Sequence, residues 1–141
     1  MMRGAGLHAV APLAVALFAA AATAAAPATK DAAPRGDATH GEAIYARCLA
    51  CHALAYDRTG PRHCGLFGRR AGSVPGFTYS EAMKKAGLVW NENTLDRFLA
   101  NPLQAVPGTA MGYAGVTDRQ ERADLIAYLK RENTSSACAK R

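Results

Sequence analysis

The chain carries the pentapeptide Cys48-Leu49-Ala50-Cys51-His52 about a third of the way along its 141 residues. Two thiols three positions apart on a helical turn can each add to one vinyl group of a haem. The histidine that follows can offer an imidazole nitrogen to the iron. This order is the attachment signature of c-type haem. We therefore favour one haem c, covalently bound through Cys48 and Cys51, with His52 as an axial ligand.

Two other interpretations of the pentapeptide remain open at this point. A disulfide or a thioredoxin-like redox pair would require a βαβ context, which the sequence does not indicate. A zinc site would require four ligands, and a second Cys/His pair at suitable spacing is missing. Both interpretations are weaker than the haem interpretation.

Helix signals lie on both sides of the motif. Thr39 and Glu42 form a capping box, which predicts a helix that begins at Thr39 and places Tyr45 and Cys48 on one face. Further helices are expected over residues 80–87, 92–100 and 118–132. In the last of these, the stripe Leu125, Ile126, Tyr128 and Leu129 is expected to face inward, and Arg119, Arg122, Lys130 and Arg131 are expected to face water.

Two glycine-rich loops, residues 59–78 and 102–117, separate these helices. No convincing alternating strand pattern is present. The expected fold is therefore all-α, with four short-to-medium helices and long loops. Long loops in so small a domain need something to wrap around, and one haem meets that need.

A six-coordinate iron would need a second axial ligand. The candidates beyond the N-terminal segment are His40, His63, Met83 and Met111. Met111 lies in a tight loop without helical periodicity, where a methionine has no ordinary packing role. Met83 lies in a short predicted helix, and His40 lies at a helix start. Met111 is therefore favoured, with His63 as the serious rival.

The N-terminus has the features of an export signal. Residues 1–24 combine one basic side chain, Arg3, with an apolar stretch and small residues before a cleavage point after Ala24. Residues 25–38 contain prolines and lack periodicity, and we expect a flexible leader there. The folded domain is expected over residues 39–141, in the periplasm. The apolar stretch is too short for a permanent membrane span.

The net charge is +6, but the basic residues are scattered in pairs rather than clustered. No nucleic-acid partner is therefore expected.

Cys64 and Cys138 remain after the haem has taken two of the four cysteines. In an exported protein, a leftover pair favours one disulfide. Free thiols or an intermolecular bridge are the alternatives.

A series of further motifs follows the pentapeptide in a fixed order. With the pentapeptide, they are Cys48 to His52, Thr59-Gly60-Pro61, Gly65 to Arg69, Pro75 to Ser80, Trp90, Asn101-Pro102, Pro107 to Met111 and Leu125 to Leu129. In this series, residues 39–132 resemble a class I cytochrome c of the soluble bacterial and mitochondrial type.

The resemblance implies a cytochrome c fold and a role for each matching position. His52 would be the proximal ligand and Met111 the distal ligand, and the Pro61 carbonyl would orient the His52 imidazole. The other implied haem contacts are Cys48 and Cys51 through thioethers, Tyr79 and Trp90 at a buried propionate, Arg69 against its charge, and Thr109 beneath the propionates and the ligand loop.

Two departures from the mitochondrial pattern remove polar groups near the distal ligand. Phe98 stands where that pattern has tyrosine, and Met83 stands where it has asparagine. A drier pocket disfavours ferric iron, so a high reduction potential is expected.

The resemblance implies a periplasmic carrier of single electrons and no enzymatic activity. The expected donors are a membrane quinol-oxidising complex or a dehydrogenase, and the expected acceptors are an oxidase, a reductase or a photosynthetic centre. A monomer is expected. The alternatives are a dedicated subunit of one dehydrogenase, or a haem enzyme or sensor with an open iron site.

Overall fold

The computed structural model describes Met1 and residues 34–139. Apart from Met1, the predicted signal peptide lies outside the described residues, as do residues 25–33 of the predicted leader. Among the helices of the described part, none is both long and apolar enough to cross a bilayer.

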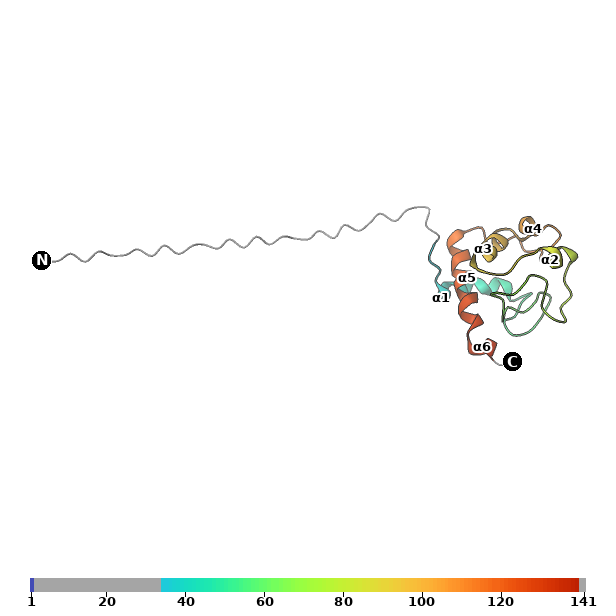
Figure 1. Ribbon diagram of the computed structural model, residues 1–141, viewed down its shortest axis with the longest axis horizontal. Helices are drawn as coiled ribbons and strands as arrows, with labels where there is room; N and C mark the ends of the chain where they lie inside the picture. Colours follow the sequence, from blue (N-terminus) through green and yellow to red (C-terminus); the bar gives the residue numbers. More distant parts are fainter. Residues whose placement is uncertain (2–33, 140–141) are drawn as a thin grey trace. The chain divides into compact units, whose positions relative to one another are not determined.

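The described chain consists of helices joined by long loops (Figure 1). In chain order they are α1 (Ala38–Tyr45), the 3-10 turn η1 (Ala46–Cys48), α2 (Glu81–Lys85), α3 (Glu92–Ala100), α4 (Pro102–Ala105), α5 (Arg119–Asn133) and α6 (Ser136–Ala139). Extended pairing within residues 34–139 is limited to one isolated bridge between Arg70 and Val89. The all-α prediction is confirmed.

Two one-turn helices, α4 and α6, are additional to the four that the sequence predicts. The expected end of α3 before Pro102 is confirmed, but this proline also begins α4. The Asn101 side chain accepts a hydrogen bond from the Gln104 N–H, and Pro102 occupies the first turn, where a missing N–H costs nothing. A proline can therefore end one helix and begin the next.

Helix α1 crosses α5, and this crossing forms the centre of the core (Figure 1). Gly41 makes the crossing possible, because a Cβ at this position would overlap the backbone of Asp124 and the side chain of Tyr128. One turn further on, the rings of Tyr45 and Tyr128 lie 5.0 Å apart. Leu125 of α5 belongs to the same core and is 1% exposed.

The N-cap of α1 corrects the sequence prediction. Asp37, not Thr39, caps the helix, and its carboxylate accepts hydrogen bonds from the N–H groups of Thr39 (2.7 Å) and His40 (3.3 Å). Glu42, the predicted partner of Thr39, forms an ion pair with Arg131 of α5 at 3.0 Å. Two capping residues lie close together in the sequence, and the contact with α5 selects the earlier one.

The ordered domain also begins earlier than the predicted residue 39. The Asp37 N–H donates to the carboxylate of Asp124 at 2.7 Å, and the Arg35 carbonyl accepts from the Gln120 side chain at 2.8 Å. Residues 35–37 therefore pack along α5 rather than belonging to the leader.

Arg122 is a third correction. We expected this side chain to face water, but it is 7% exposed. Its guanidinium donates to the Asp96 carboxylate at 2.8 Å and to the carbonyls of Val116 and Thr117, each at 2.9 Å. A buried charge is tolerated when its donors are satisfied. Here it ties the loop before α5 to α3.

Candidate functional site

A mainly apolar cavity of about 500 Å³ lies among α1, α2, α3, α5 and the long loops. This volume falls within the range of roughly 300–1,000 Å³ that is usual for cofactor sites. The cavity brings together all nine residues for which the sequence predicts a role in cofactor binding. They are Cys48, Cys51, His52, Pro61, Arg69, Tyr79, Trp90, Thr109 and Met111.

The pentapeptide forms a tight turn after η1. The N–H groups of Cys51 and His52 both donate to the Cys48 carbonyl, at 3.1 and 2.9 Å. Neither Cys48 nor Cys51 is paired with another sulfur. Burial raises the pKa of the Cys48 thiol, and the nearby Arg47 opposes that rise. Two unpaired thiols therefore stand at the cavity wall.

His52 is 9% exposed, and one of its ring nitrogens is hydrogen-bonded. Its Nδ1 lies 2.7 Å from the Pro61 carbonyl oxygen. A carbonyl only accepts, so Nδ1 carries the proton and Nε2 keeps a lone pair. Burial lowers the pKa of His52, although the hydrogen bond to Pro61 opposes this shift. The ring is thus prepared as a neutral metal ligand.

Met111 reaches the same cavity from the loop between α4 and α5. Gly108 enters this loop at a φ of +87°, a conformation that favours glycine. The Met111 N–H donates to the Thr109 hydroxyl at 3.3 Å, and Thr109 itself is 9% exposed. Thr109 therefore shapes the backbone that presents the methionine.

Of the other candidates for the second ligand, His63 and Met83 also line the cavity, and His40 does not. The His63 ring stacks on His52 with centroids 4.4 Å apart and planes inclined by 19°. It lies against the face of the His52 imidazole. Met83 is 8% exposed within the hydrophobic core, and the His40 side chain is 76% exposed.

Arg69, Tyr79 and Trp90 lie on one part of the cavity wall. The backbone N–H of Trp90 donates to the Arg69 carbonyl at 2.9 Å. The Arg69 guanidinium donates to the carbonyls of Cys64 (3.0 Å) and Arg62 (2.9 Å). Burial raises the pKa of the Tyr79 hydroxyl. The Arg69 guanidinium, the Tyr79 hydroxyl and the Trp90 indole N–H are all hydrogen-bond donors. On a mainly apolar wall, such donors suit the carboxylate groups of a ligand.

Gly60 has a role that the sequence did not reveal, although it lies in one of the ordered motifs. A Cβ at this position would collide with the His52 imidazole. Gly60 therefore leaves the space that the ring occupies. The signal in the sequence is a glycine directly before Pro61, whose carbonyl holds the same ring.

The donor set fits haem c. Two thiols, a neutral imidazole and a thioether converge on an apolar cavity, and a cation with ring-borne donors stands on its wall. In the described part of the chain, no cluster of three or more His, Cys, Asp or Glu side chains is placed to hold a metal ion. The same residues contain no strand that could supply the βαβ context of a thioredoxin-like pair.

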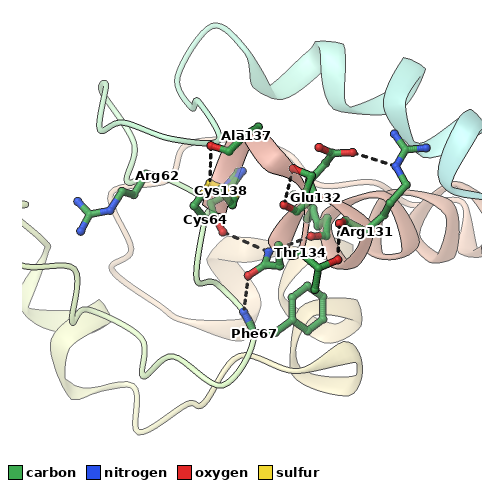
Figure 2. The surroundings of a disulfide bond; sticks show 12 residues. Arg62, Cys64, Phe67, Arg131, Glu132, Thr134, Ala137 and Cys138 are labelled. Atoms are coloured by element: carbon green, nitrogen blue, oxygen red, sulfur yellow. Dashed lines mark hydrogen bonds and ion pairs between the residues drawn. A yellow bond between two sulfur atoms is a disulfide. The ribbon is translucent and has the colours of Figure 1, made fainter. Parts of the chain in front are cut away.

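Outside the cavity, Cys64 and Cys138 form a disulfide with their Cα atoms 5.2 Å apart (Figure 2). It joins α6 to the loop that follows Pro61. The adjacent contacts are between Asn133 of α5 and this loop. The Asn133 side chain accepts from the Phe67 N–H at 3.4 Å and donates to the His63 carbonyl at 3.3 Å.

Known proteins are similar to this chain in sequence and in fold. The chain matches the family profile described as Cytochrome c over residues 38–132. It is 48% identical over 87 residues to cytochrome c of Sesamum indicum, covering 60% of this chain and 78% of that protein. It is 42% identical over 94 residues to cytochrome c2 of Blastochloris viridis, covering 64% and 74%.

Among solved structures, cytochrome cH from Methylobacterium extorquens matches with a TM-score of 0.67 and 42% identity. The match covers 68% of this chain and 99% of that one. The profile, the relatives and the cavity agree with one another. The chain therefore belongs to the cytochrome c family of electron-carrying haem proteins, with its haem c attached covalently through cysteines.

Proposed function

We propose that this protein is a periplasmic electron shuttle whose haem is ligated by His52 and Met111. The observation that carries the proposal is their convergence. A neutral imidazole with its Nδ1 held by Pro61 and a methionine from a separate loop line one cavity, beside two unpaired thiols. When bound, haem c supplies an iron centre that cycles between ferrous and ferric states.

The surrounding residues hold and shield this centre. Cys48 and Cys51 would anchor it, and Pro61 fixes the orientation of the His52 ring through the 2.7 Å hydrogen bond. Arg69, Tyr79, Trp90 and Thr109 are proposed to receive the propionates. If His52 and Met111 both hold the iron, no site on it would be left for a substrate. This arrangement suits electron transfer better than catalysis.

The apolar lining supports a high reduction potential. Met83 and Phe98 are 8% and 6% exposed, and both line the cavity. An apolar environment penalises the additional positive charge of ferric iron, and an axial methionine acts in the same direction. Redox titration should therefore place the potential at or above that of ordinary class I relatives.

The proposed location rests on the export-type N-terminus and on the pairing of Cys64 with Cys138, since disulfides persist in oxidising compartments. The proposed partners are a membrane quinol-oxidising complex or a dehydrogenase as donor, and an oxidase, reductase or photosynthetic centre as acceptor.

Optical spectroscopy of the exported protein tests the ligand set. The wild-type ferric protein should be low-spin with the weak long-wavelength band of a methionine–iron bond. Met111→Ala should abolish this band and make the iron bind cyanide readily, whereas Met83→Leu should retain the band. A wild-type spectrum that is high-spin and reactive with cyanide at neutral pH would contradict the shuttle and favour a haem enzyme.

A further inference from the structure

We infer that His63 and Tyr45 form a positioning pair that sets the plane of the His52 imidazole. The His63 ring stacks on the His52 ring, so it would lie on the same side of a haem held by His52. The inference rests on the proposed ligation of iron by His52 and concerns how the chain holds that ring.

The His52 ring is held at one edge and covered on one face. The hydrogen bond from Nδ1 to the Pro61 carbonyl oxygen holds this edge at 2.7 Å. A single hydrogen bond still allows the imidazole to rotate about the line that joins the two atoms. The His63 ring lies over the imidazole face, with centroids 4.4 Å apart and planes inclined by 19°. Contact across a face restricts the rotation that one edge contact permits.

The His63 ring is in turn held by Tyr45. The Tyr45 hydroxyl lies 3.0 Å from His63 Nδ1. Tyr45 is 3% exposed on α1, and its ring packs 5.0 Å from that of Tyr128 on α5. Tyr45 thus connects the His63 ring to the α1–α5 crossing at the centre of the core.

The backbone of His63 is held on two sides. Its N–H points at the carbonyls of Ala53 and Leu54, both at 3.1 Å, and its carbonyl accepts from the Asn133 side chain at 3.3 Å. The next residue, Cys64, is cross-linked to α6 through Cys138 (Figure 2). The backbone of His63 is therefore held in place, and its ring is held by the hydrogen bond with Tyr45.

Groups around a metal-bound histidine orient it and tune the metal. If His63 acts in this way, its removal should alter the electronic signature of the haem on the His52 side while leaving the methionine bond intact. A residue that serves packing alone would lower stability without changing that signature. This difference makes the role of the pair measurable.

The experiment uses the haem-loaded ferric protein and proton NMR of the iron-shifted His52 ring and haem methyl signals, with the reduction potential as a second measurement. His63→Leu should change the spread of these signals and shift the potential. Tyr45→Phe should move the signals in the same direction by less. His63→Phe keeps a ring that can stack and should restore most of the wild-type pattern. All variants should keep the long-wavelength methionine band.

His40→Leu is the matched control, because it makes the same replacement at an exposed histidine on α1. Its spectrum should match wild type. If the His52 and haem signals of His63→Leu also match wild type, the inference is overturned, even if the variant unfolds more easily. Should His63→Leu fail to mature, Tyr45→Phe decides, and wild-type signals there overturn the inference.

The two proposals fail in different ways. A wild-type protein without any iron-shifted His52 signal would contradict ligation by His52 and overturn both. A wild-type protein with those signals, together with unchanged variants, would overturn only the role of His63 and Tyr45.

Discussion

The backbone of Gly60 lies against the His52 ring so closely that no side chain fits between them. The neighbouring Pro61 supplies the carbonyl that binds Nδ1 of that ring. Two consecutive residues thus provide the space for the imidazole and fix its tautomer. A glycine here is required by close approach and not by an unusual φ angle, because Gly60 is not among the residues with positive φ.

Gly60→Ala should therefore displace His52 and break its hydrogen bond to Pro61. Forced overpacking of this kind costs about 1–3 kcal/mol. The free energy of unfolding and the yield of covalently bound haem should both fall. Ala55→Ser, which adds one atom at an exposed position of the same loop, is the control. A Gly60→Ala protein with wild-type haem yield and stability would contradict the close contact.

Single elements take their ends from the surroundings as well as from local signals. The predicted bounds of α3 agree with the structure, and Asp118, the first residue of the last predicted helix, is the N-cap of α5. At α1, Asp37 and Thr39 are both acceptable caps by residue type. The hydrogen bond from the Asp37 N–H to Asp124 fixes the chain so that Asp37 occupies the cap.

Asp37→Ala should lower the melting temperature at neutral pH, whereas Thr39→Ala should change it little. The N–H groups of Thr39 and His40 lower the pKa of Asp37 below its ordinary value of 3.8. The stabilisation is thus present above that value and is lost as the pH falls through the depressed folded-state pKa. Thermal unfolding of both variants at neutral and strongly acidic pH checks this, and an equal effect at both pH values would refute it.

Three segments that are remote in the sequence meet around the loop after Pro61. Tyr45 comes from α1, Asn133 from the end of α5, and Cys138 from α6. The disulfide closes a loop with a sequence separation of 74 residues. It fastens the C-terminal turn to the part of the chain that surrounds His52.

Replacing both Cys64 and Cys138 by serine should destabilise the protein. Chain entropy alone gives about 4 to 5 kcal/mol for a loop of this length, and covalent haem should reduce the measured loss because it already constrains the chain. Denaturant unfolding of the haem-loaded protein measures the difference. Alkylation of the unfolded wild type provides the control, and two reactive thiols there would show that the disulfide does not form.

The haem attachment motif, the all-α class and the main helices could be predicted from the amino-acid sequence alone. These are local properties, because thiol spacing, apolar periodicity and capping residues act over a few positions. The sequence also indicated Met111, since a methionine in a non-periodic loop has no ordinary packing role.

The folded chain was needed to show which residue caps α1, why Arg122 is buried, and that the His63 ring stacks on the His52 ring. Each of these depends on a partner far away in the chain: Asp124 for Asp37, Asp96 for Arg122, and Tyr45 for His63. A polar or charged side chain is buried where it finds its hydrogen bonds, and only the folded chain brings those groups together.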